Sequence, residues 1–288
     1  MIASAVHTRP APVSARAPAV ASVAVRPLLA SADAHGEVLG VSSHAVWIRT
    51  GEDIVVVSTR DATRLPNSVE IALDASTDPF VSIEHGGRAA LNPTSIVLRG
   101  LTVEVVRWWD ARPALPSLRP AELAIAYDRL PSAIAPVASK DLRHALATAS
   151  ADSLCDAAAS LLGQGSGLTP EGDDYLAGAL AATRTLGSAI GSNEALEMLD
   201  ACEGRLARFA RRATTTFSAA LIRCALRGEV AAPAGAFLRS LAGRGDVATT
   251  HRHLRSVGHT SGPALAAGIV LGAQSLVDPH TTPHGGFQ

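Results

Sequence analysis

The residue types of the chain change near Pro120, and this change constrains the fold more than any single motif. From about Glu37 to Val106, short runs rich in Val and Ile alternate with glycine, proline and aspartate. Such runs are typical of β-strands joined by turns. After Pro120 the sequence is rich in Ala, Leu and Arg at helical spacing. We therefore expect an α+β fold, with a mostly antiparallel β unit over residues 31–118 and an α-helical unit over residues 119–278.

The same patterns predict individual elements. Strands are expected at Val38–Ile48, Ile54–Ser58, Val69–Leu73, Phe80–Ile83, Ser95–Leu98 and Leu101–Val106. Arg99 and Gly100 are expected to form a hairpin turn between the last two. Helices are expected at 121–130, 138–162, 170–188, 193–227, 233–243, 246–256 and 262–277, with a division of the fourth near Gly204.

Both ends of the chain differ in character from the rest. Residues 1–30 carry arginines but no acidic residues, and Pro10, Pro12, Pro18 and Pro27 would interrupt an amphipathic helix. We expect a disordered Ala/Pro/Arg tail there. Residues 279–288 are expected to form a flexible tail.

Composition excludes several functions. The formal net charge is −1 and aromatic residues make up 3% of the chain, which argues against nucleic-acid or anionic-membrane binding. Lys140 is the only lysine, so lysine-based chemistry has little support. No apolar run reaches the length of a membrane span. Cys155, Cys202 and Cys224 form no CxxC pair, and we expect buried, reduced thiols in a cytoplasmic protein.

The segment Gly163–Asp174 (GQGSGLTPEGDD) carries the strongest indication of a site. Glycines at alternate positions allow close approach by a ligand or by another backbone. Thr169 and Pro170 suit the start of a helix, where negative charge is favoured. We expect an anion to bind near Gly165, Gly167, Thr169 and Gly172. Asp173 and Asp174 are candidate catalytic groups and candidate ligands for a cation such as Mg²⁺.

Related glycine motifs fit this segment less well. It has no lysine for a phosphate-binding Walker A loop, and the residues before it have helical rather than strand periodicity. No serine stands at the centre of a GxSxG elbow. A structural alternative remains, in which one aspartate caps loop amides and the glycines, with Gly172, Gly178 and Ala182, allow close helix packing.

A second glycine-bounded loop, Gly258–Gly262, precedes the last helix. Thr260 or Ser261 can cap that helix, next to His259. His259 is a candidate general acid, base or oxyanion donor, and Thr260, Ser261 and Gly262 are candidate ligand-binding residues. The alternative is a histidine that only contacts a backbone carbonyl.

Arginines form a stripe on one predicted helix. Arg205, Arg208 and Arg212 share a face beside an apolar stripe. A solvated face is the plainer interpretation, and anion binding by Arg212 is the functional one. The hydroxyls of Thr214, Thr215, Thr216 and Ser218 favour a site near this helix.

Together, the run GxGxGLTPxGDDxLxG (Gly163–Gly178) and the run GHTSGxxLxxG (Gly258–Gly268) resemble a bacterial family that includes the AllH-type subunit of oxamate carbamoyltransferase. The segment Thr215–Ser218 is similar too, and Asn92 matches a family asparagine at a strand end. The resemblance implies carbamoyl transfer in allantoin and purine catabolism, where oxalurate and phosphate interconvert with oxamate and carbamoyl phosphate. It also implies FdrA-like and AllG-like partner subunits.

Two other functions stay open at this point. The chain can be a non-catalytic assembly or anion-sensing subunit in which both loops only pack helices. It can also be a metal-dependent hydrolase that uses Asp173 and Asp174.

Overall fold

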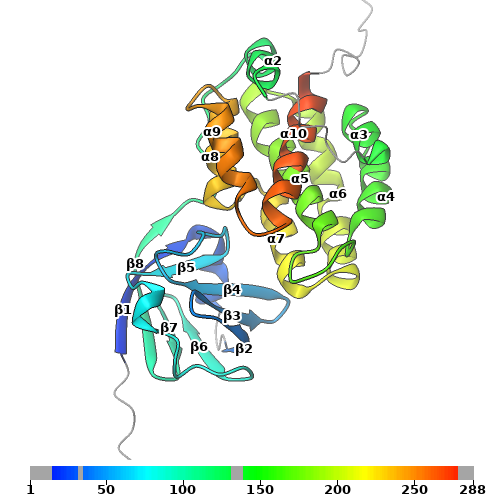
Figure 1. The fold of residues 1–288 in the computed structure, drawn as a ribbon. Helices are drawn as coiled ribbons and strands as arrows, with labels where there is room; N and C mark the ends of the chain where they lie inside the picture. Colours follow the sequence, from blue (N-terminus) through cyan, green and yellow to red (C-terminus); the bar gives the residue numbers. More distant parts are fainter. Residues whose placement is uncertain (1–14, 32–34, 131–138, 278–288) are drawn as a thin grey trace, which may run out of the picture.

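The computed structural model describes residues 15–31, 35–130 and 139–277. Figure 1 shows two units, a β-barrel from the first part of the chain and a helical bundle from the rest. The barrel strands are β1 (Ala15–Ser22), β2 (His35–Val41), β3 (Ala45–Thr50), β4 (Asp53–Ser58), β5 (Ser68–Ile71), β6 (Arg88–Asn92), β7 (Ser95–Leu98) and β8 (Leu101–Trp109). Three short helices accompany them, η1 (Val23–Val25), α1 (Arg26–Ala30) and η2 (Ala75–Thr77).

The β unit is a closed mixed barrel. Its strand order is β1-β5-β4-β3-β2-β6-β7-β8, and β1 then pairs with β8. The pairs β1–β8 and β4–β5 are parallel, whereas the other neighbouring pairs are antiparallel. The α+β class is confirmed, but the expected antiparallel sheet has to be corrected to this barrel. Local hairpin patterns predict antiparallel neighbours and carry no information on pairing between distant strands.

The expectation of a disordered tail does not hold for residues 15–30. They form β1, η1 and α1, and β1 closes the barrel. Ala17, Ala19 and Ala21 alternate toward the core and are buried. Pro18 is tolerated in the strand because its carbonyl still accepts a hydrogen bond from the Ala72 amide, at 2.9 Å. The remaining residues of the two predicted tails, 1–14 and 279–288, lie outside the described residues.

Of two further predictions for the β unit, one is confirmed and one is wrong. The hairpin at Gly100 is confirmed, since β7 and β8 pair across it and its φ is +76°. Phe80–Ile83 is not a strand but a turn, from which Phe80 and Ile83 pack into the barrel core. Their apolar character reflects this burial and not strand pairing.

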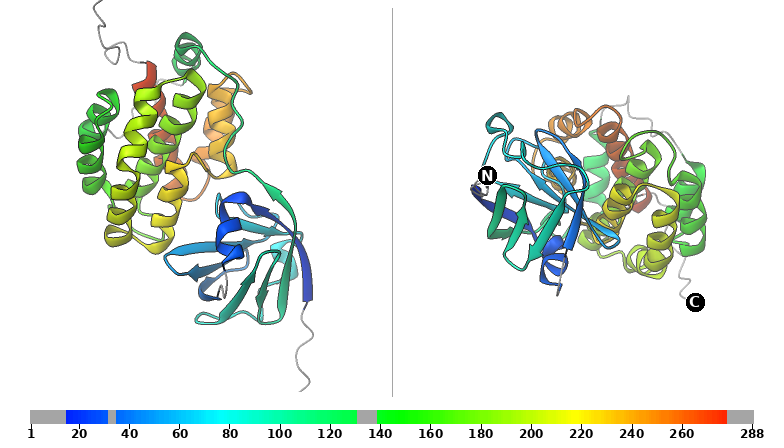
Figure 2. Two further views of the ribbon diagram at one scale, coloured as in Figure 1. Left: turned by 180° about the vertical axis from the view of Figure 1, so that it is seen from behind. Right: turned by 90° about the horizontal axis from the view of Figure 1, so that it is seen from below.

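The helical unit starts after a crossing segment that runs along it from β8 (Figure 2). Its helices are α2 (Pro120–Asp128), α3 (Lys140–Ala147), α4 (Ala151–Leu161), α5 (Glu171–Ile190), α6 (Asn193–Ala213), α7 (Thr216–Leu226), α8 (Ala232–Leu241), α9 (Val247–Arg255) and α10 (Ser261–Val277). None of the helices in the described part of the chain is long and apolar enough to span a bilayer. Cys155, Cys202 and Cys224 are free and buried, as expected.

Two of the predicted helical segments are each divided in the structure, at positions that the sequence analysis did not predict. The predicted helix 138–162 breaks at Ala149, which adopts a left-handed conformation, and Ser150 caps α4. The predicted helix 193–227 breaks at Thr214–Thr215 rather than near Gly204, because the Thr215 side chain caps α7. The break places hydroxyl groups beside the glycine loop.

Helices α5 and α10 form the centre of the bundle and run parallel to one another. A Cβ on Gly178 would lie 2.2 Å from the Leu265 carbonyl oxygen, and one on Gly268 would lie 2.0 Å from that of Tyr175. The same parallel alignment of the two helices continues toward both ends. Thr169 lies next to Ser261, and Gly187 lies next to Leu276. Glycine is therefore required at this crossing, and both helices begin at the same end of the bundle.

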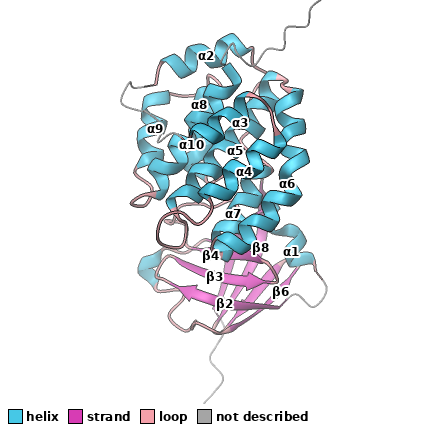
Figure 3. Ribbon diagram, turned by 90° about the vertical axis from the view of Figure 1, so that its right-hand side faces the viewer, coloured by secondary structure: helices cyan, strands magenta, loops and turns pink. Residues whose placement is uncertain are grey.

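That end faces the barrel (Figure 3). Strand β4 is apolar on both faces because Val55 and Val57 fill the barrel core while Ile54 and Val56 pack against α7. Arg223 of α7 donates hydrogen bonds to the Glu52 carbonyl oxygen, at 2.8 Å, and to the Asp53 carboxylate. The two units thus share an apolar contact with a charged rim.

Candidate functional site

A cavity of about 410 Å³ lies where the barrel meets the helices. The barrel contributes Trp47 of β3 and the β4–β5 connection, and the bundle contributes the beginnings of several helices. The lining residues are Trp47, Thr63, Leu65, Pro66, Thr169, Asp174, Ala177, Phe217, Leu221, Ala225, Glu229, Val230, Ala231, Pro233, Leu254, Val257, Gly258, Ser261, Gly262 and Leu265. This volume lies within the range of small-molecule sites, on the order of 300–1,000 Å³.

The two loops singled out in the sequence meet in this cavity. The Thr169 and Ser261 hydroxyl oxygens are 2.9 Å apart and share a hydrogen bond. Asp174, one turn into α5, and Gly262, in the first turn of α10, line the same cavity. The parallel packing of α5 and α10 accounts for this, because it aligns the starts of both helices.

Asp174 is the most perturbed ionisable group at the cavity. The residue is 8% exposed, and its Oδ2 atom is buried with no hydrogen-bond partner. Burial raises the pKa of Asp174 to about 7, although the Ser261 and Thr169 hydroxyls favour the charged form. A carboxyl group that titrates near neutral pH can take up and release a proton under ordinary conditions.

The stability of the protein is expected to depend on the ionisation of Asp174. Its pKa is higher in the folded than in the unfolded state, so its stabilising effect is complete below about pH 4 and is lost as the pH rises to about 7. The difference between the pKa values of Asp174 in the folded and unfolded states corresponds to about 4 kcal/mol in the free energy of unfolding. Chemical denaturation between pH 5 and 7 should therefore show a steeper decline in the free energy of unfolding for the wild type than for Asp174→Asn. Equal slopes for the two proteins would contradict the assignment.

Asp173 occupies a different environment from its neighbour. Its Oδ1 atom accepts a hydrogen bond from the Gly163 amide at 2.7 Å, and its Oδ2 atom accepts from Ser218 at 2.7 Å and from Thr214. Asp173 is almost completely buried and does not line the cavity. It fixes the glycine loop against α7, which is the structural role left open for one of the two aspartates.

Replacement of Asp173 is expected to damage folding more than ligand binding. Asp173→Ala leaves one buried and two partly buried donors without this acceptor and should lower the free energy of unfolding by about 3 kcal/mol or more. Glu171→Ala, an exposed change in the same helical turn, is the matched control and should stay within about 0.5 kcal/mol. Urea denaturation of both variants makes the comparison. A fully stable Asp173→Ala protein would exclude the structural role.

The glycines of the first loop mostly serve close packing. A Cβ on Gly163 or Gly172 would lie 2.2 Å from a backbone oxygen, of Ala213 and Leu161 respectively, and one on Gly165 would lie 2.7 Å from the Glu171 amide nitrogen. Gly167 is exposed with no atom close to its Cβ position. The Gly172, Asp173 and Asp174 amides already donate within the loop and the first turn. These three amides are therefore already engaged within the protein.

Several residues predicted from the sequence lie outside the cavity lining. His259 and Thr260 are exposed on the α9–α10 connection, and Arg212 is exposed at the end of α6. Asn92 is exposed in the β6–β7 hairpin, where its Nδ2 donates to the Ser95 hydroxyl at 3.3 Å. The structure therefore brings together Thr169, Asp174, Ser261 and Gly262 and separates them from these four. Their roles as ligand-binding or catalytic residues stay predictions.

A cation at Asp173 and Asp174 finds little support in the geometry. Both oxygens of Asp173 accept hydrogen bonds from protein groups. Among residues 15–31, 35–130 and 139–277, no group of three or more His, Cys, Asp or Glu side chains is placed to hold a metal ion. Mg²⁺ prefers several oxygen ligands in octahedral geometry, which this pair alone does not provide.

The part of the cavity that the barrel provides was not predicted from the sequence. Trp47 packs edge-on against Phe217 of α7, with ring centroids 6.4 Å apart and an angle of 81°. Glu229 follows α7 and pairs with Arg227 at 2.7 Å. Trp47 and Glu229 belong to no local motif, and only the docking of the two units brings Trp47 to the site.

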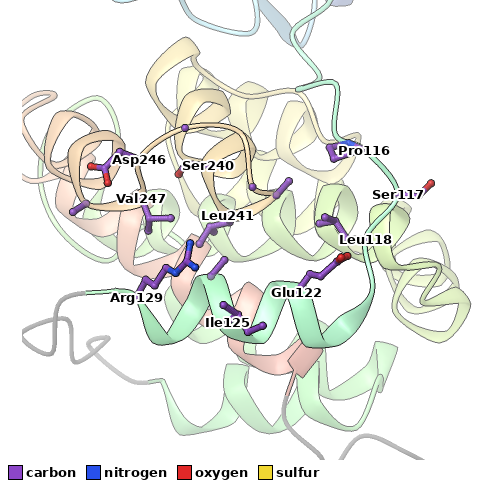
Figure 4. Close-up of a pocket in the computed structure, with 15 residues that line it drawn as sticks. Pro116, Ser117, Leu118, Glu122, Ile125, Arg129, Ser240, Leu241, Asp246 and Val247 are labelled. Carbon is purple, nitrogen blue, oxygen red and sulfur yellow. The ribbon is translucent and has the colours of Figure 1, made fainter.

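A second cavity, of about 470 Å³, lies between α2 and the α8–α9 connection (Figure 4). Glu122 and Arg129 extend toward it from α2, and Asp246 stands at the start of α9. It shares no lining residue with the first cavity and contains none of the residues predicted from the sequence.

Comparison with known proteins identifies a family match that includes both glycine loops at the cavity. Residues 161–273 match the family described as oxamate carbamoyltransferase subunit AllH. This part of the chain is therefore similar to AllH-type subunits. The matched region runs from the end of α4 into α10 and includes both loops that meet at Thr169 and Ser261, so the resemblance inferred from the sequence is confirmed there. No curated protein and no solved structure gives a significant match.

The AllH match also has a clear boundary. It excludes the whole barrel, and with it Trp47 and the β4–β5 connection at the cavity. The name of the family suggests a subunit of a multi-subunit enzyme. The cavity therefore combines residues inside and outside the matched region.

Proposed function

We propose that the chain is a subunit of a carbamoyl-transfer enzyme of the oxamate carbamoyltransferase type, and that the cavity beside Asp174 binds the carbamoyl group. The observation that carries this proposal is the meeting of the two AllH-matched loops at Thr169 and Ser261, next to a buried carboxyl group with an unpartnered oxygen. In the reaction, a phosphate oxygen forms a bond to the carbamoyl carbon of oxalurate. The bond from that carbon to the oxamate nitrogen breaks, and this nitrogen takes the proton of hydrogen phosphate.

The side chains at the cavity complement a carbamoyl group. Such a group presents N–H donors and a carbonyl acceptor, and Asp174 offers a carboxyl oxygen for the former. The Thr169 and Ser261 hydroxyls can turn one hydrogen toward the carbonyl oxygen. With its pKa of about 7, Asp174 can also pass the proton to the leaving nitrogen.

Four helices direct their first turns at this cavity. These are α5 at Asp174, α7 at Phe217, α8 at Pro233 and α10 at Ser261. Helix N-termini carry partial positive charge, which stabilises negative charge as it develops on a carbonyl oxygen during attack. The arrangement therefore supports polarisation of the carbamoyl carbonyl.

We assign phosphate binding to partner subunits, namely the FdrA-like and AllG-like proteins expected from the resemblance. Among the described residues that line the cavity, none is Arg, Lys or His. A phosphate is a dianion that proteins normally hold with cationic side chains. A partner that docks at the cavity mouth would supply these groups.

The test is co-expression of this chain with FdrA-like and AllG-like subunits, followed by an assay of phosphate-dependent oxalurate cleavage. The complex should form carbamoyl phosphate and oxamate, whereas any subunit alone should be inactive. Complexes lacking this chain serve as the control. A complex that is fully active without it would refute the proposal.

A non-catalytic assembly or anion-sensing subunit is the second candidate, and the tight glycine contacts of both loops favour it. Gly172, Gly178 and Gly268 are each needed for close backbone packing, as the structural alternative requires. Under this alternative, removal of the Asp174 carboxyl group leaves turnover unchanged while complex assembly depends on the chain. The unpartnered Asp174 oxygen at a cavity favours the catalytic proposal.

A further inference from the structure

The walls of the Asp174 cavity are mainly apolar. Large side chains surround the carboxyl and hydroxyl groups on several sides, among them Trp47, Leu65, Phe217, Leu221, Val230 and Leu265. Apolar walls contribute binding free energy in proportion to the apolar ligand surface that they cover. A ligand that filled this space with polar groups alone would lose their hydration without compensation.

The charges at the cavity do not suit a multiply charged ligand. Its two acidic residues are Asp174 and Glu229, and Glu229 is 8% exposed and already paired with Arg227. In the part of the chain that the structure describes, no Arg, Lys or His side chain lines the cavity. The helix N-termini favour partial negative charge, which an amide oxygen carries, but they do not neutralise a dianion.

The barrel provides one aromatic wall of this space. Trp47 belongs to β3, outside the AllH-matched residues, and its ring contacts Phe217 of α7 edge-on. The Trp47 Nε1 atom is buried with no hydrogen-bond partner. Leu65 and Pro66, from the β4–β5 connection, extend the same wall.

We propose that this cavity binds a ureido or primary-amide compound whose remaining part is apolar, with the amide end at Asp174, Thr169 and Ser261 and the apolar part against Trp47 and Phe217. The proposal rests on the carbamoyl-binding role of Asp174 put forward above. It makes the barrel a part of the binding site that determines which substituent is accepted. Trp47 is then a specificity-determining residue.

Calorimetric titration of the full-length chain with urea, methylurea, butylurea, benzylurea and inorganic phosphate tests this directly. Each fully covered CH₂ group should tighten binding about fourfold, so butylurea should bind at least about tenfold more tightly than methylurea. Inorganic phosphate should not bind. Equal affinities of butylurea and methylurea, or the absence of binding by all the ureas, would overturn the proposal.

Variants test separately the contacts proposed for the apolar end and for the amide end of the ligand. Trp47→Leu should weaken benzylurea binding about tenfold and change methylurea binding little, and Trp47→Phe should retain most of the affinity. Asp174→Asn should weaken all the ureas. The exposed barrel change Val106→Ala is the control and should have no effect. Benzylurea binding that is unchanged in Trp47→Leu would contradict the role of the barrel.

These measurements do not depend on turnover. If apolar ureas bind but the reconstituted complex does not cleave oxalurate, the proposed ligand class is supported and the proposed oxalurate reaction is refuted. If the complex is active but only oxalurate or phosphate binds the isolated chain, the proposed function is supported and the proposed binding of apolar ureas is refuted.

Discussion

Gly268→Ala is expected to lower the free energy of unfolding by about 3 kcal/mol or more, with a fall in Tm of about 10 °C. The new Cβ would lie 2.0 Å from the Tyr175 carbonyl oxygen and 2.9 Å from the Ala179 amide nitrogen. Both are backbone atoms of α5, so the two helices must separate to relieve the contact. Separation also displaces Ser261 from Thr169 and should weaken ligand binding at the cavity.

Gly204→Ala is the matched control for this prediction. Gly204 also lies within a helix, α6, but it is exposed and its nearest external atom is the end of the Arg208 side chain, 3.6 Å away. Alanine there should be neutral or should stabilise the protein by up to about 1 kcal/mol. Thermal unfolding of both variants tests the comparison. An equal Tm for Gly268→Ala and the wild type would show that α5 and α10 are not packed this closely.

Asp174→Asn is expected to lower kcat/KM for phosphate-dependent oxalurate cleavage by about a hundredfold or more in the reconstituted complex. Asparagine keeps the shape of the side chain but cannot exchange a proton, and loss of a general acid or base usually reduces rates by about 10² to 10⁴. Burial raises the pKa of Asp174 to about 7, so wild-type activity should also change with pH in this region. That change should be absent in the residual activity of the variant.

Glu171→Gln is the control for Asp174→Asn because it removes an exposed carboxylate from the same first turn of α5. Its activity should stay within about twofold of the wild type. The assembly of each variant complex, measured by size-exclusion chromatography, separates loss of chemistry from loss of the complex. An Asp174→Asn complex with full activity would leave the assembly function as the better explanation.

The sequence predicted the parts of the fold that depend on local patterns. The α+β class, the Gly100 hairpin and the helix starts at the two glycine loops are local, since turn residues and periodicity determine them. The division of the helix at Thr214–Thr215 was predictable in principle, because Thr215 is a good N-cap residue. The β1 strand was missed because prolines and small residues in a terminal segment are also typical of disorder.

The candidate site was predictable only in part, for a related reason. Thr169, Asp174 and Ser261 stand in motifs, and the GxGxGLTPxGDD and GHTSG runs identified them. Which aspartate faces the cavity depends on where Thr214 and Ser218 lie in space, because they bind Asp173. Trp47 lies 122 residues before Thr169 in the chain, and only the contact between β3, β4 and α7 brings it to the site.

A crystal structure of the chain soaked with an alkylurea such as butylurea tests the central claim most directly. We predict ligand density in the cavity between the barrel and the bundle, with the amide group within hydrogen-bond distance of Asp174 and of the Thr169 and Ser261 hydroxyls. Density elsewhere, for example at the exposed Gly167 or His259, with the Asp174 cavity empty, would contradict the account.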